Sequence, residues 1–289
     1  MSTPDSPTAH TDHADHADDR FERWFPGVPP DPRLPSLLCL AGSGAGPGEF
    51  RPWKAALSGR IEVAAVALPG REHRAREPNI DSLPELVTRL KRAAAPLLTA
   101  PFALFGYSTG ALVMYELARS FTPEQRGNLL HLFVGGQPAP RWPQTDSGHS
   151  DQSDAELIDY LRRMGGTPEE VLNSPPFMRL FLRALRADLR FAERYDHPGP
   201  AHLPCPLTLF AGQHDAVVPP HTLPAWVEET ARAFRFVRLP GAHFTLRTDR
   251  DLIIAGISAL CGSTRSAHGS LPHAPPAHPP SRQPRCWSK

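Results

Sequence analysis

The chain has 289 residues, with Lys+Arg 31 against Asp+Glu 30 and a formal net charge of +1. This length suits one large domain, or two small ones, with a sizeable core. The balanced charge and the lack of a basic block argue against a nucleic-acid partner. No apolar run reaches the length of about 18 residues that a membrane helix needs, so no membrane association is expected.

Both ends of the chain have the composition of tails. Residues 1–20 are acidic and contain almost nothing that a core could bury, and residues 264–289 are rich in proline and histidine. Such segments cannot offset the conformational entropy that ordering removes. We therefore expect disordered tails over 1–20 and 264–289, on either side of one folded domain over 21–263.

The cellular compartment is predicted from what the sequence lacks. The N-terminal segment has no apolar stretch of the kind found in secretory signals. The four cysteines of the chain show no CxxC spacing and are too few for a disulfide scaffold. We expect reduced thiols and a cytoplasmic location.

Apolar runs and helical patterns alternate along the domain. Strands are predicted from short apolar runs that end at turn residues, at 34–40, 61–68, 102–105, 129–135, 206–211 and 234–239. Helices are predicted from apolar residues three or four positions apart, at 81–98, 111–120 and 252–260. This alternation indicates an α/β fold, with a mainly parallel sheet flanked by helices on both faces.

One segment interrupts the alternation. Residues 154–195 have a helical pattern throughout, between two predicted strands. We expect an inserted helical lid, over about 150–198, above the carboxyl edge of the sheet. Open α/β sheets bind their ligands at that edge.

The strongest local motif is GYSTG at 106–110, between a predicted strand and a predicted helix. This is the setting of a nucleophile elbow, a sharp turn that exposes a serine at the edge of the sheet. Side chains at 106 or 110 would crowd the neighbouring elements, which explains the glycines. Ser108 is the candidate nucleophile.

A serine nucleophile needs a base that is oriented by an acid, and after such an elbow the acid precedes the base in the chain. Asp215 follows the predicted strand 206–211, and His243 follows the predicted strand 234–239. His221 also lies within the folded region, and His214 is interpreted as a loop neighbour of the acid. We therefore predict the pair Asp215 and His243.

Acyl transfer also requires N–H donors for an oxyanion. The Thr109 backbone N–H, directly after the serine, is one candidate. The second should come from the glycine-rich turn 41–46, with Ser43 the best choice. This turn lacks the lysine of a phosphate loop, and Pro47 stands where a dinucleotide motif needs glycine. With no zinc-type spacing elsewhere, no metal and no cofactor is expected.

Several motifs together resemble those of the type II thioesterases that accompany modular polyketide and nonribosomal peptide synthases. The similarity extends over about 33–262. It is carried by LPGREHR at 68–74, FGYSTGAL at 105–112, YELAR at 115–119, LRAD at 185–188 with Tyr195, and GAHF at 241–244. The family usually has histidine where this chain has Tyr107, and its oxyanion loop commonly reads HAGGS. We expect these two differences to affect the shape of the pocket and the acyl preference.

The resemblance implies an α/β-hydrolase with a helical lid. It implies the triad Ser108, Asp215 and His243, with oxyanion donors at Ser43 and Thr109. Such an enzyme hydrolyses acyl thioesters on the phosphopantetheine arm of acyl or peptidyl carrier proteins, and needs no cofactor of its own because the partner carries that arm. Part of the apolar face of the lid, for which Leu185 is an example, should line the acyl pocket.

Four functions are considered. The resemblance favours editing, the removal of aberrant acyl groups from stalled carriers. Release of a finished chain uses the same chemistry. A general carboxylesterase of the same fold would act without a carrier, and a non-catalytic carrier-binding protein would not need the intact serine, acid and histidine.

Overall fold

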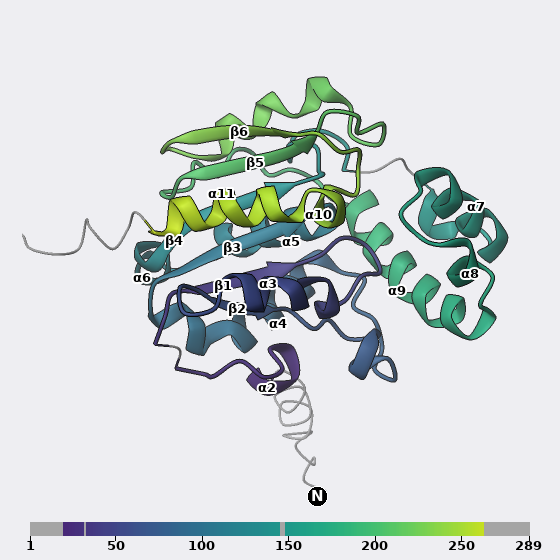
Figure 1. Cartoon of the computed structure of the whole chain (residues 1–289), viewed down its shortest axis with the longest axis horizontal. Coiled ribbons are helices and arrows are strands. Elements are labelled where there is room, and N and C mark those ends of the chain that lie inside the picture. Colours follow the sequence, from purple (N-terminus) through teal and green to yellow (C-terminus); the bar gives the residue numbers. More distant parts are fainter. Residues whose placement is uncertain (1–19, 32, 145–147, 263–289) are drawn as a thin grey trace, which may run out of the picture.

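The computed structural model describes residues 20–31, 33–144 and 148–262 (Figure 1). Apart from Arg20, the two predicted tails lie outside these residues. None of the helices in the described ranges is both long enough and apolar enough to cross a membrane.

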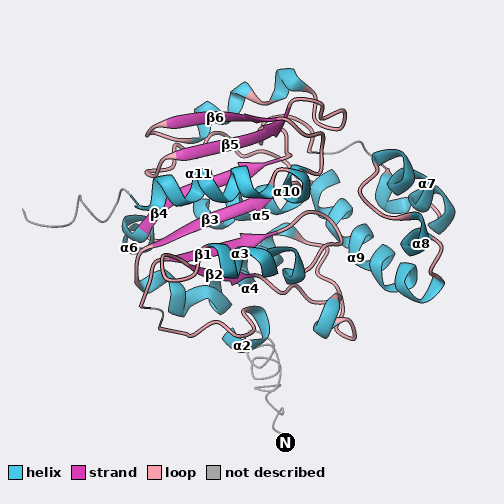
Figure 2. Cartoon of the chain, viewed as in Figure 1, coloured by secondary structure: helices cyan, strands magenta, loops and turns pink. Residues whose placement is uncertain are grey.

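Six parallel strands form one sheet in the order β2-β1-β3-β4-β5-β6 (Figure 2). All six predicted strands are present. They are β1 (Ser36–Leu40), β2 (Glu62–Ala65), β3 (Phe102–Tyr107), β4 (Leu129–Gly135), β5 (Leu207–Gly212) and β6 (Phe234–Leu239). The second strand ends before its predicted limit at residue 68, because the Ala67 N–H donates to the Trp24 carbonyl oxygen at 2.8 Å and not to a neighbouring strand.

Helices connect the strands and cover both faces of the sheet. They are α2 (Phe21–Trp24), α3 (Arg51–Ala56), α4 (Leu83–Ala94), α5 (Thr109–Arg119), α6 (Pro123–Asn128), α7 (Asp154–Met164), α8 (Glu169–Leu172), α9 (Pro175–Glu193), α10 (Thr245–Thr248) and α11 (Arg250–Gly262). Short 3-10 turns are η1 (Pro47–Phe50), η2 (Glu72–Arg74), η3 (Ala95–Thr99), η4 (His149–Asp151), η5 (Pro220–Thr222) and η6 (Pro224–Glu229). The predicted helix 81–98 is thus α4 followed by η3. The change comes at Pro96, which has no N–H for the α-helical bond.

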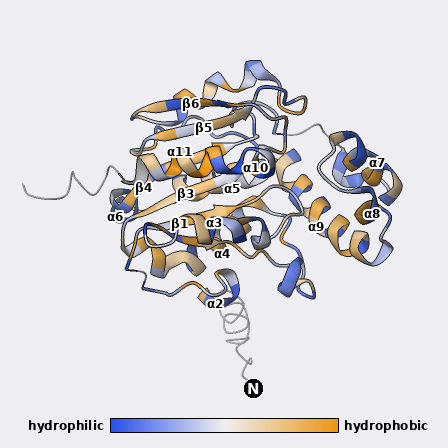
Figure 3. Ribbon diagram, viewed as in Figure 1, coloured by the Kyte–Doolittle hydropathy of each residue, from blue (hydrophilic) through white to orange (hydrophobic). Residues whose placement is uncertain are grey.

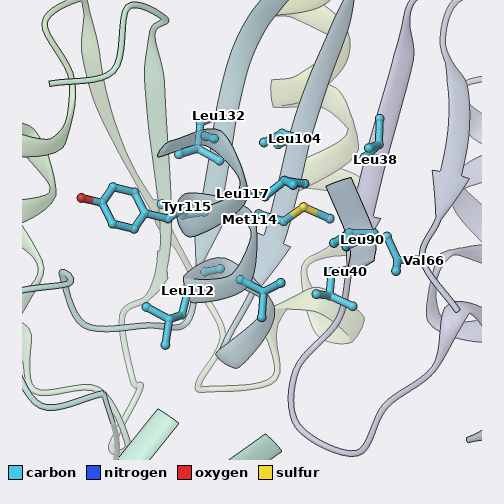
Figure 4. Packing of buried hydrophobic residues seen from close by; sticks show 14 of the residues in the cluster. Leu38, Leu40, Val66, Leu90, Leu104, Leu112, Met114, Tyr115, Leu117 and Leu132 are labelled. Carbon is cyan, nitrogen blue, oxygen red and sulfur yellow. The ribbon is translucent and has the colours of Figure 1, made fainter. Parts of the chain in front are cut away.

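The core has two parts, one on each face of the sheet, because side chains alternate along a strand. Leu38 and Leu40 of β1 pack toward α4 and α5 (Figure 4). Leu37 and Cys39 pack on the opposite face, which α3 and α11 cover. The strands next to the centre therefore carry hydrophobic residues along their length (Figure 3), as expected for a parallel sheet buried on both faces.

The interruption of the alternation is confirmed as a helical insertion between β4 and β5. It contains α7, α8 and α9, which lie together beyond one end of the sheet (Figure 1). These helices have a small core of their own, made by Leu157, Leu161, Leu172, Met178, Leu182, Leu185 and Leu189. We call α7, α8 and α9 the lid.

Short elements do not show in the sequence pattern. α2 buries Trp24 completely, and the Arg74 guanidinium lies 4.9 Å from the centre of that ring. Arg74 is itself buried and binds the Ala67 carbonyl oxygen and the Glu77 carboxylate. A four-residue helix has too few positions to display a period, so only its tertiary contacts reveal it.

Candidate active site

Ser108 stands at the turn between β3 and α5, with backbone angles φ 53° and ψ −132°. A positive φ at a residue with a side chain is strained and needs support from its surroundings. Here the Ser108 N–H donates to the Gly135 carbonyl oxygen at 2.7 Å, and its carbonyl oxygen accepts from Ala111 N–H at 2.7 Å. The serine is therefore held partly exposed at the carboxyl end of the sheet.

The surrounding glycines make this turn possible. A Cβ at Gly106 would overlap the Gly110 carbonyl oxygen, and a Cβ at Gly110 would overlap the Leu40 carbonyl oxygen. A Cβ at Gly42 would lie 2.9 Å from Ser108 Cβ. β1, β3 and α5 thus approach one another as closely as the backbone allows, as the motif predicts.

Asp215 and His243 meet at the carboxyl ends of β5 and β6. His243 Nδ1 lies 3.0 Å and 3.2 Å from the two Asp215 oxygens, and the two side chains are 8% and 5% exposed. Burial raises the pKa of Asp215, but the hydrogen bond and charge of His243, with the Val217 and Val218 amides, bring its pKa below the usual value. The ionised carboxylate only accepts hydrogen bonds. Nδ1 is therefore the donor in this contact, and in the neutral form of the ring Nε2 has the lone pair.

The other histidines considered in the sequence are not in this pair. His214 is exposed beside Asp215, and the His221 ring packs edge-on against Trp142. Among the described side chains, no hydrogen bond joins Ser108 to His243. Such contacts commonly tighten only when substrate binds.

The two candidate oxyanion residues are neighbours. Ser43 Oγ, after β1, lies 3.0 Å from Thr109 Oγ1, at the start of α5. Thr109 is buried, and Ser43 is partly exposed. The structure therefore brings the glycine-rich turn and the elbow together at one place, as the sequence predicts.

A buried ion pair that sequence reasoning missed supports the glycine-rich turn. The Arg71 guanidinium binds the Asp188 carboxylate through two contacts of 2.8 and 2.9 Å. The Gly44 N–H donates to the same carboxylate at 2.8 Å. Asp188 belongs to α9, so one lid residue holds both the loop after β1 and the loop after β2. The available signal was an acid on the apolar face of a helix, which requires a buried partner.

A lid aromatic ring also covers the turn. A Cβ at Gly44 would lie 2.7 Å from Phe181 Cε2, so this ring rests directly on the glycine. Leu185, given above as an example of a pocket-lining residue, is instead 3% exposed within the lid core. The lid side chains that contact the glycine-rich turn are therefore Phe181 and Asp188 of α9.

The described residues contain no group of three or more His, Cys, Asp or Glu side chains placed to hold a metal ion. The described Cys39 and Cys205 are free and buried.

Comparison with known proteins agrees with this geometry. The family model of the thioesterase domain matches residues 35–261. Gramicidin S biosynthesis protein GrsT of Aneurinibacillus migulanus is 37% identical over 210 residues, 73% of this chain and 82% of that protein. Thioesterase PikA5 of Streptomyces venezuelae is 32% identical over 241 residues, 83% of this chain and 85% of that protein.

Solved structures give the same result. The type II thioesterase BorB from the borrelidin biosynthetic cluster has a TM-score of 0.74 and 36% identity, covering 82% of this chain and 97% of that one. RedJ with a PEG molecule in its active site has a TM-score of 0.71 and 33% identity, covering 90% and 98%. The chain therefore belongs to the thioesterase family of hydrolases and has its α/β-hydrolase fold.

Proposed function

We propose that this thioesterase hydrolyses acyl groups from the phosphopantetheine arm of acyl or peptidyl carrier proteins in polyketide or nonribosomal peptide biosynthesis. Its role is to clear aberrant acyl groups from stalled carriers. The names of its relatives, which include biosynthesis proteins of gramicidin S and borrelidin, support this setting. The observation that carries the proposed chemistry is the buried pair of His243 with an ionised Asp215 at the edge where Ser108 emerges.

In the proposed reaction, Nε2 of His243 accepts the Ser108 hydroxyl proton while Oγ attacks the thioester carbonyl carbon. Asp215 holds the ring by Nδ1 and stabilises the imidazolium cation. The tetrahedral intermediate collapses, the C–S bond breaks, and the imidazolium protonates the departing phosphopantetheine sulfur. Water, deprotonated by the same Nε2, then attacks the acyl-enzyme, and Ser108 regains its proton as the acid leaves.

The oxyanion of both intermediates is assigned to the backbone N–H groups of Ser43 and Thr109. Their contact through Oγ and Oγ1 supports this assignment, since it brings the two main chains together beside Ser108. One such donor contributes about 10²–10³-fold in kcat. No cofactor takes part, because the pantetheine arm belongs to the partner.

The decisive experiment uses a panel of carrier proteins loaded with acetyl, propionyl and longer acyl groups, read by intact-protein mass spectrometry. The wild type should return the free thiol of the carrier. Ser108→Ala should lose nearly all turnover and all labelling by a fluorophosphonate. Ser120→Ala is the matched control, because the Ser120 hydroxyl only binds the Leu117 carbonyl oxygen at the end of α5.

Three outcomes would contradict the proposal. Turnover by Ser108→Ala at the wild-type rate would exclude the nucleophile. Hydrolysis of a simple aryl ester in preference to every acyl carrier at equal concentration would indicate a general carboxylesterase. An editing enzyme should act on short acyl groups, whereas strong preference for a complete chain would indicate product release.

A further inference from the structure

Tyr107, the residue before the candidate nucleophile, reaches across to the loop that carries His243. Its side chain is 3% exposed, and its hydroxyl donates to the His243 carbonyl oxygen at 2.6 Å. Thr245 Oγ1 lies 2.5 Å from the same hydroxyl. A carbonyl oxygen can only accept and a tyrosine has one hydroxyl proton. Thr245 is therefore the donor in the second contact.

The ring of Tyr107 is fixed by its packing. A Cβ at Gly135 would lie 2.8 Å from Tyr107 Cε2, and a Cβ at Gly136 would lie 2.7 Å from Cε1. Gly136 also has φ +60°, a conformation that favours glycine. Because neither glycine at the end of β4 has a side chain, the ring packs directly against the backbone there. Burial raises the pKa of the Tyr107 hydroxyl far above its usual value, so the group stays protonated and remains a donor.

Tyr107 and Ser108 are consecutive in the chain, and their contacts hold both the candidate nucleophile and the candidate base. The Ser108 N–H is anchored to the Gly135 carbonyl oxygen at 2.7 Å, and Tyr107 holds the main chain of His243. Asp215 fixes the imidazole through Nδ1, so the histidine is held at its side chain and at its peptide.

We propose that Tyr107 is a positioning residue, whose hydroxyl fixes the peptide of His243 so that Nε2 stays in register with Ser108. The inference rests on the proposed triad. Orientation of a base matters strongly, because a displacement of about 1 Å can cost about 10²-fold in rate. Tyr107 itself touches no substrate and takes no proton in the reaction.

The test is Tyr107→Phe, which keeps the ring packed against Gly135 and Gly136 and removes only the hydroxyl. We expect kcat to fall by about 10-fold to 100-fold, the range that a misplaced base produces, with KM changed by less than about twofold because no substrate contact is removed. The acid limb of the pH profile of kcat/KM reports the free base. A misplaced base should change this profile, whereas a residue with a purely structural role would leave it unchanged.

Tyr115→Phe is the matched control. Tyr115 is buried on α5 and donates its hydroxyl to Glu229, away from His243. Its loss should lower the melting temperature and leave kcat and the pH profile unchanged. A Tyr107→Phe enzyme with wild-type kcat and pH profile would overturn the proposal. So would equal kinetic effects of the two variants.

A second variant covers failure of Tyr107→Phe to fold. Thr245→Val removes the donor to the Tyr107 hydroxyl and retains the side-chain shape. It should lower kcat and change the pH profile in the same way as Tyr107→Phe, whereas an unchanged kcat and pH profile would refute the role of this contact. Ser108→Ala, assayed in parallel, separates the two ideas: its activity would reject the triad, and its inactivity beside a fully active Tyr107→Phe would reject only the positioning role.

Discussion

Asp188→Ala would leave the Arg71 guanidinium buried without its counter-charge. The two side chains are 3% and 6% exposed, so water would not replace the lost carboxylate. Removing one partner of a buried ion pair costs about 3–5 kcal/mol. The Gly44 N–H loses its acceptor in the same substitution. We expect the free energy of unfolding to fall by this amount and kcat to fall with it, because the turn that carries Ser43 is no longer held.

The assay combines urea unfolding, followed by circular dichroism, with turnover of an acyl-loaded carrier. Asp154→Ala is the matched control on the same lid. Its carboxylate pairs with Arg186 at 2.7 Å but is 69% exposed, and exposed pairs contribute at most about 1 kcal/mol. If Asp188→Ala is no less stable than this control, the buried pair does not hold the lid. If it is less stable but turns over normally, the pair does not serve the candidate oxyanion turn.

Asp215→Asn should lower kcat by about 10⁴-fold in steady-state kinetics, as the equivalent change does in a serine protease, and a loss below about tenfold would point to another acid. Phe181→Ala should alter the ratio of kcat/KM between acetyl and longer acyl carriers. Leu185→Ala should lower the melting temperature and leave that ratio unchanged. The opposite pattern would contradict the placement of these two side chains. Burial, aided by the charge of Arg235, lowers the pKa of His131 from 6.5 to about 4. As the pH falls from 6.5 toward 4, protons bind the unfolded state preferentially, so about 2 kcal/mol of the free energy of unfolding should be lost by pH 5. In urea unfolding at pH 7 and pH 5, His131→Gln should show a smaller decline than the wild type. An equal decline in the two proteins would refute this role of His131.

The strands and the three candidate triad residues could be predicted because their signals are local. Ser108, Asp215 and His243 each follow an apolar strand, and the carboxyl ends of parallel strands meet at one edge. The glycines of the elbow are explained by the steric demands of a sharp strand-to-helix turn alone. The pairing of Asp215 with His243 is a tertiary contact, and it is seen in the 3.0 Å separation of their side chains.

Contacts between distant segments could not be predicted in this way. Arg71 and Asp188 are 117 positions apart, and no period or turn in either segment specifies the other. Leu185 shows the same limit within one helix. The spacing of α9 reveals an apolar face, but the packing of α7 and α8 decides which of its residues are enclosed in the lid. An effect of Tyr107 on the acyl pocket stays a prediction, whereas the bond from its hydroxyl to the loop of His243 is a tertiary contact that the sequence does not specify.

Gly44 lies between two side chains of α9, with the Asp188 carboxylate on its N–H and the Phe181 ring over its Cα. The helix that we expect to line the acyl pocket therefore also supports the turn beside Ser108. A substitution on α9 that is made to change substrate preference should therefore also change the rate of turnover. Selections for altered preference should accordingly vary the loop after β1 together with α9, since improvement in either segment alone is limited by its fit to the other.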